Sequence, residues 1–137
     1  MLRSLSHFLL SCVFISEGWG ALSQPGGRPS RVAAAGIPQS ERAVELNGAL
    51  MVIAGLLLGL DIAPKGAATV LLGSMIPTTI VGHAFWKEEA GPPRQHHRTQ
   101  FLKNLGLIGG LLLVLTEKDE CTWAPLLRGG EAVRAFS

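Results

Sequence analysis

The sequence predicts an all-α fold: a four-helix transmembrane bundle in which neighbouring helices are antiparallel. Of the 137 residues, 47% are hydrophobic and only 16% are charged, against roughly 25% charged in an average soluble protein. Four apolar stretches account for this composition, at residues 4–22, 44–60, 66–86 and 101–115. Each is near the roughly 17–25 residues that a helix needs to cross a bilayer, although the last is short. The alternative, a very apolar soluble helical protein, would need a charged shell that this composition barely supplies.

The first stretch, residues 4–22, is interpreted as a retained membrane span. It carries His7 and Glu17 and is the least apolar of the four, and Trp19 near its end suits the aromatic belt of a membrane interface. Arg3 before an apolar run is also typical of a secretory signal. However, the run before Cys12 is too short for the roughly 7–15 apolar residues of a signal peptide, and the apolar run continues well beyond this cysteine.

Residues 23–42 are rich in proline and glycine, which predicts an interfacial loop rather than a long helix. The second stretch, residues 44–60, is followed by a short turn at residues 61–65. So short a connection requires the third helix to be an antiparallel neighbour of the second.

The third stretch, residues 66–86, contains Pro77. Proline lacks the backbone N–H that would bond to the carbonyl of Gly73, which predicts a helix kinked at this position. Thr78 and Thr79 follow, and their hydroxyl groups can bond back to free carbonyls within the membrane.

Beyond the third stretch, residues 87–100 are hydrophilic, and the polar residues 118–137 form a C-terminal tail after a membrane domain of residues 1–117. The two longer loops and their flanks hold seven of the twelve basic residues: Arg28, Arg31, Arg42, Lys87, Arg94, Arg98 and Lys103. The positive-inside rule then predicts that these loops face the cytoplasm and both termini lie outside. The basic residues form no run, so no nucleic-acid partner is expected.

Small residues recur at helical spacing on three of the stretches: Gly55, Gly59, Ser74, Thr78, Gly82, Gly106 and Gly110. Small residues four positions apart leave a groove on one helix face, which lets a neighbouring backbone approach closely. We expect these residues to pack helices together within the chain, with a homo-oligomer formed through one groove as the alternative.

Four antiparallel spans would place several polar residues near the same membrane face as Glu17: Glu45, Asn47, His83, Lys103 and Asn104. Helical spacing puts Glu45 and Lys103 on the glycine-bearing faces of their helices. A charge near hydrocarbon must be paired, hydrated or extended to the interface. We therefore expect an ion pair between Glu45 and Lys103, with the asparagines bonded nearby. A pair that only locks the helix register is the alternative.

The sequence alone does not decide which chemical role this polar cluster has. His83 could shuttle protons, bind a quinone oxygen or simply bond to a threonine at the interface. His96 and His97 are adjacent, so they point in different directions, and no metal site is expected. Cys12 and Cys121 form no C-x-x-C pair, and nothing supports a disulfide between them. No nucleophile elbow, phosphate loop or dinucleotide fingerprint is present, so no catalytic residue is assigned.

Two motifs resemble the DoxX family of small bacterial integral membrane proteins: PTTIVGHAFW at residues 77–86 and FLKNLGLIGG at residues 101–110. GWGALSQP at residues 18–25 and ELNG at residues 45–48 are similar too, so the resemblance covers about residues 5–115. It implies a four-helix membrane bundle and a link to redox systems, because members are associated with a thiosulfate:quinone oxidoreductase or with complexes that handle thiol and oxidative stress. Distant relatives include cargo receptors and assembly chaperones, and the resemblance implies no catalytic residues.

These observations predict a multi-pass protein of the bacterial inner membrane that serves as a non-catalytic subunit or scaffold of a redox system. Its partners would be the lipid bilayer and an oxidoreductase. The alternative is a quinone-reactive subunit that handles protons at the polar face. A small-molecule or proton transporter is a third hypothesis. The apolar middles of the second and fourth stretches argue against it, because transport sites need polar residues at the bilayer midplane.

Overall fold

A computed structural model describes residues 1–118 and confirms the all-α fold, with no strand in this part of the chain. The elements are α1 (Leu2–Ser23), α2 (Arg28–Ala34), α3 (Ser40–Gly59), α4 (Pro64–Gly82), the single 3-10 turn η1 (Phe85–Lys87) and α5 (Pro92–Thr116). The predicted tail lies, apart from Lys118, outside the described residues.

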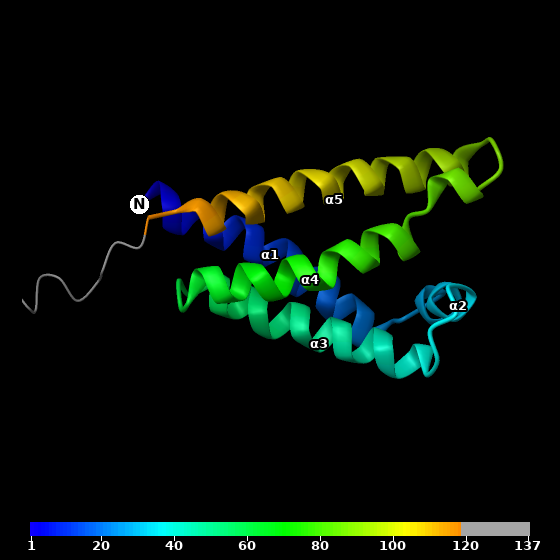
Figure 1. Ribbon diagram of the computed structural model, residues 1–137, viewed down its shortest axis with the longest axis horizontal. Helices are drawn as coiled ribbons and strands as arrows, with labels where there is room; N and C mark the ends of the chain where they lie inside the picture. The colour runs from blue at the N-terminus through cyan, green and yellow to red at the C-terminus, as the bar shows by residue number, and fades with distance from the viewer. Residues whose placement is uncertain (119–137) are drawn as a thin grey trace, which may run out of the picture.

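Four of the helices, α1, α3, α4 and α5, are long and apolar enough to cross a membrane. Figure 1 shows that α4 lies between α3 and α5, while α1 crosses behind them and packs chiefly against α3. The N-terminus, the α3–α4 turn and the end of α5 lie at one end of the bundle, here called the turn face. The α1–α3 connection with α2, and the α4–α5 connection with η1, lie at the other end, here called the loop face.

Two boundaries and one element differ from the sequence-based expectation. α5 begins at Pro92 rather than near residue 101, because proline suits the first turn of a helix and polar side chains there can project from the loop face. α4 ends at Gly82, and η1 replaces its expected last turn. Residues 23–42 are not only a loop, since they contain the short helix α2, which has a proline in its first turn.

The bend at Pro77 is slight, at 12°. Helix α4 continues through the proline, and the hydroxyl groups of Thr78 and Thr79 each donate a 2.8 Å hydrogen bond to the carbonyl four residues earlier. Neither bond reaches the carbonyl of Gly73, which Pro77 leaves without its helical N–H donor. The two hydroxyl groups instead bond to the carbonyls of Ser74 and Met75.

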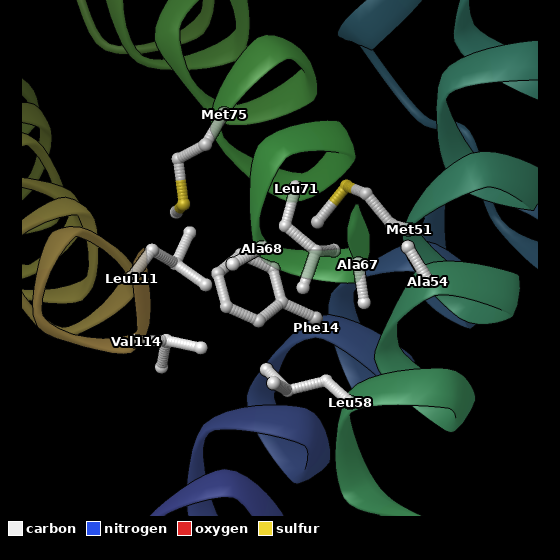
Figure 2. Packing of buried hydrophobic residues seen from close by; sticks show 10 residues of the cluster. All are labelled: Phe14, Met51, Ala54, Leu58, Ala67, Ala68, Leu71, Met75, Leu111 and Val114. Atoms are coloured by element: carbon white, nitrogen blue, oxygen red, sulfur yellow. The ribbon is translucent and has the colours of Figure 1, made fainter. Parts of the chain in front are cut away.

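The buried core centres on Phe14 of α1 (Figure 2). Side chains from α3, α4 and α5 surround its ring: Met51, Ala54, Leu58, Ala67, Ala68, Leu71, Met75, Leu111 and Val114. The side chain of Phe14 therefore packs in a cluster to which α3, α4 and α5 all contribute.

The expected packing of small residues occurs at most of the predicted positions. Added Cβ atoms at Gly55, Gly59 and Gly110 would meet Ile15, Ser11 and Leu10, all of α1. Ser74 is buried and Thr78 half-buried on the α3 side of α4. At Gly82 and Gly106 the expected packing within the chain is wrong, because no neighbouring atom of the described residues lies within 4 Å of a Cβ added there. The alternative, a homo-oligomer formed through one groove, stays a prediction. Gly106 lies on the outer side of α5, the least buried of the four spans.

Candidate functional site

The two asparagines of the predicted polar cluster bond to opposite sides of α4. Asn47 accepts a 2.7 Å hydrogen bond from the Ser74 hydroxyl and donates one of 3.1 Å to Thr78 Oγ1. Asn104 donates a 3.0 Å bond to Thr79 Oγ1. Each asparagine thus joins its helix to α4, and the two do not share a site.

Glu45 and Lys103 do not form the expected ion pair among the described residues, and both side chains are exposed. The reason is the order of the helices. Glu45 lies on α3 and Lys103 on α5, and α4 separates these two helices. Both residues lie toward the loop face, where a long side chain can extend its charge to the headgroup region.

His83 belongs to a different group, the loop-face cluster of Arg31, His83, Glu88 and His97. His83 Nδ1 lies 3.4 Å from His97 Nδ1. The guanidinium of Arg31 lies 3.0 Å from His97 Nε2 and donates a 2.6 Å hydrogen bond to the carbonyl of Gly82. Glu88 Oε1 lies 3.8 Å from His97 Nε2. Four segments of the loop face therefore meet around one buried imidazole.

Sequence reasoning did not single out Arg31 and His97 as partners of His83. His97 is 7% exposed and His96 is exposed, because both lie on the early turns of α5 and point to different sides of it. An earlier start for α5, indicated by Pro92 and Pro93, would have placed His97 on a helix facing the bundle.

A second polar group, the turn-face cluster, consists of Arg3, His7, Asp61 and Glu117. His7 is fully buried. Its Nδ1 lies 2.8 Å from Asp61 Oδ1 and its Nε2 lies 3.1 Å from Glu117 Oε1. Arg3 donates a 3.3 Å hydrogen bond to Asp61 Oδ2, and its Nε lies 3.9 Å from Glu117 Oε2. The cluster joins the start of α1, the α3–α4 turn and the end of α5.

The turn-face cluster was absent from the predicted sites. Arg3 and His7 are four residues apart and so lie on one face of α1, which is the signal that could have indicated it. Asp61 lies in the turn between α3 and α4. Burial raises the pKa of its carboxyl, but hydrogen bonds from His7 and Arg3, together with their charges, lower the pKa below the ordinary aspartate value.

The described residues contain no group of three or more histidine, cysteine or acidic side chains arranged to hold a metal ion. In the turn-face cluster, the two carboxylates bond to different nitrogens of the His7 ring. Cys12 is a free, exposed cysteine, and Cys121 lies outside the described residues. What the two clusters offer is a pair of neighbouring imidazoles at one face and an imidazole between carboxylates at the other.

Comparison with known proteins identifies one family. The family model described as DoxX matches residues 5–84, which is more than half of the 137-residue chain. The match includes α1, α3 and α4, whereas the motif at residues 101–110 on α5 lies beyond it. No curated protein and no solved structure matches the chain significantly.

Proposed function

This chain belongs to the DoxX family, and from this premise we propose that it is a non-catalytic scaffold subunit of a redox system in a bacterial inner membrane. Its four apolar helices support a multi-pass protein. In this proposal the longer loops face the cytoplasm, where they hold an oxidoreductase partner against the membrane. The family resemblance suggests redox chemistry linked to thiols, oxidative stress or quinones.

The observation that carries the scaffold proposal is the organisation of the loop face. Arg31 of α2 contacts both the end of α4, at Gly82, and His97 of α5. The connections at this end are therefore linked to one another by side chains. Charged and exposed side chains surround them, including Lys87, Arg94 and Arg98. A surface that combines defined structure with exposed charge suits electrostatic docking of a protein.

The packing of the bundle favours a scaffold over a transporter. The polar groups of Asn47, Ser74 and Thr78 bond to one another across the α3–α4 contact. The fully buried side chains of Phe14 and Leu71 fill the bundle beside them. A transport path requires polar groups that are available to a substrate or ion near the midplane. Here such groups are used to join two helices.

The scaffold proposal can be tested by purifying the full chain from its native membranes in mild detergent. We expect an oxidoreductase, recognised by mass spectrometry and by the optical spectrum of its cofactor, to copurify with the wild type. The double substitution Arg94→Glu and Arg98→Glu should reduce its recovery at least about tenfold, because opposed like charges at an interface cost several kcal/mol. Both arginines are exposed on the loop face.

The matched control is Lys118→Glu, which reverses an exposed charge beside the turn face. Its recovery of the partner should equal that of the wild type. Preparations that contain no oxidoreductase would contradict the proposal. So would an equal loss of the partner in the control and in the double variant.

A quinone-reactive subunit is the second candidate, and one arrangement favours it. Near the His83–His97 pair, three aromatic rings of Phe85, Trp86 and Phe101 pack edge to face, with centroids 5.3–5.9 Å apart. A quinone ring can stack on such side chains while a histidine donates to its carbonyl oxygen. Solvent extraction and mass spectrometry of the purified protein should then find about one quinone per chain. Substitution His83→Ala should remove it, whereas His96→Ala should not.

A further inference from the structure

The contacts of His7 restrict where protons can reside in the turn-face cluster. A neutral imidazole has one N–H donor and one acceptor nitrogen, and an ionised carboxylate only accepts hydrogen bonds. Yet both ring nitrogens of His7 face carboxylate oxygens, Asp61 Oδ1 at 2.8 Å and Glu117 Oε1 at 3.1 Å. Both contacts are hydrogen bonds only if His7 carries two ring protons, or if one of the two carboxyl groups is itself protonated.

The other charges at this face distinguish these two states. Arg3 lies against both carboxylates, 3.3 Å from Asp61 Oδ2 and 3.9 Å from Glu117 Oε2. The remaining titratable groups at this end of the described chain are also cationic: the amino terminus of Met1 on α1, Lys65 in the first turn of α4 and Lys118 after α5. Cations beside a carboxyl group favour its ionised form. With both carboxylates ionised, His7 must donate from both nitrogens.

Charge balance and burial agree with an imidazolium. Within this group of four side chains, Arg3 and a doubly protonated His7 would set two positive charges against the two negative charges of Asp61 and Glu117. A fully buried charge is tolerated when it is paired and hydrogen-bonded, and here it is paired on both sides of the ring. A neutral His7 would instead present a lone pair to a carboxylate at hydrogen-bonding distance.

We propose that His7 is held as an imidazolium between Asp61 and Glu117, and that this bridge is a proton-dependent latch at the turn face. It ties α1 to the α3–α4 turn and to the residue that follows α5. Loss of one proton leaves His7 bonded to only one of the two carboxylates. Arg3 still contacts both carboxylates, so the tie between α1 and either the turn or the end of α5 is weakened. The contact between α1 and α5 is otherwise short, and the latch makes this contact sensitive to the pH on its side of the membrane.

The direct test is nuclear magnetic resonance of the full chain in detergent micelles, with ¹⁵N-labelled histidine. At pH 7.4 we expect the ring of His7 to show two protonated nitrogens, and the exposed His96 serves as an internal reference. In the double variant Asp61→Asn and Glu117→Gln, His7 should become neutral at the same pH. Neutral His7 signals in the wild type would overturn the proposal, and this outcome does not depend on the folding of any variant.

Hydrogen exchange tests the mechanical part of the latch. At pH 7.4, His7→Gln should accelerate amide exchange in the last turn of α5 and in residues 60–63, because an uncharged amide cannot reproduce two charge-assisted bonds. The control His96→Gln should leave both segments unchanged. In the wild type, raising the pH until His7 loses a proton should bring exchange to the level of His7→Gln, after correction for intrinsic rates. Unchanged protection in His7→Gln would show that the cluster does not hold these segments together.

Discussion

Single residues set the distance between helices at the crossing of α1 and α3. A Cβ added at Gly18 would lie 2.7 Å from the carbonyl oxygen of Gly48, and one added at Gly48 would lie 2.9 Å from that of Gly18. Both obstacles are backbone atoms, so the helices would have to separate to admit a methyl group. The two glycines therefore allow α1 and α3 to pack backbone to backbone.

We predict that Gly18→Ala lowers the free energy of unfolding by about 1–3 kcal/mol through overpacking. Thermal or denaturant unfolding of the purified protein in detergent measures this change. Gly106→Ala is the matched control, since no neighbouring side chain or helix among the described residues lies within 4 Å of the added methyl group. It should be neutral or slightly stabilising, because alanine favours helix over glycine by about 1 kcal/mol. Equal losses in both variants would exclude close packing at Gly18 as the cause.

Asp61 makes stability depend on acid pH. Burial acts to raise its pKa in the folded protein, but His7 and Arg3 together lower the pKa below the ordinary aspartate value, so the folded state favours the ionised form. The resulting stabilisation is fully present above the pKa of the unfolded chain, about 4, and is lost as the pH falls through the lower folded value. We predict that Asp61→Asn reduces the melting temperature at neutral pH, and that its difference from the wild type shrinks as the pH is lowered below about 4. A difference that is constant across this range would contradict ionic stabilisation by Asp61.

Between elements, polar side chains add specificity to helix contacts that are otherwise apolar. Asn47 accepts a hydrogen bond from Ser74 and donates one to Thr78, and these two bonds link α3 to α4 at one register. We predict a coupling energy of about 0.6 kcal/mol, and at most about 1.7, in a double-mutant cycle of Asn47→Ala and Ser74→Ala, as for other hydrogen bonds between membrane helices.

The matched cycle combines Glu45→Gln with Lys103→Gln. These residues were expected to pair, but they lie exposed on two helices that α4 separates. Their coupling energy should be indistinguishable from zero. A sizeable coupling between Glu45 and Lys103, with none between Asn47 and Ser74, would mean that α3 contacts α5 rather than α4.

For the whole molecule, the bundle predicts which exposed positions share a side of the membrane. In a background with Cys12→Ser and Cys121→Ser, the variants Gly27→Cys and Glu89→Cys place thiols on the loop face, and Ile62→Cys places one in the turn between α3 and α4. All three native residues are exposed. An impermeant thiol reagent should label position 62 in intact cells and positions 27 and 89 only after permeabilisation.

Labelling distinguishes topology from orientation. If all three positions reacted from the same side, the four-span arrangement would be wrong. If positions 27 and 89 reacted from outside and position 62 did not, the four spans would stand. The cytoplasmic placement of the loops would then be reversed, because that placement depends on the modest excess of basic residues near the longer loops.

The sequence by itself determined the number and order of the membrane spans. A spanning helix needs a minimum length of apolar residues and satisfies its own backbone, so length and composition carry that information locally. The turn at residues 61–65 likewise implied that α3 and α4 are antiparallel neighbours, and the structure has only Leu60–Ala63 between them. Small residues at Gly55, Gly59 and Gly110 also indicated packed faces, and α1 covers all three.

Only the tertiary structure decided which polar side chains meet. Glu45 and Lys103 lie toward the same end of the bundle but on helices that α4 separates. His7, in contrast, meets Asp61 and Glu117 from positions 54 and 110 residues away in sequence. Such meetings depend on the order of the helices around the bundle and on the rotation of each about its axis. Membrane helices are apolar on their lipid-facing and core-facing sides alike, so hydrophobic periodicity does not reveal that rotation. The contacts between helices in the folded bundle show how each helix is rotated about its axis.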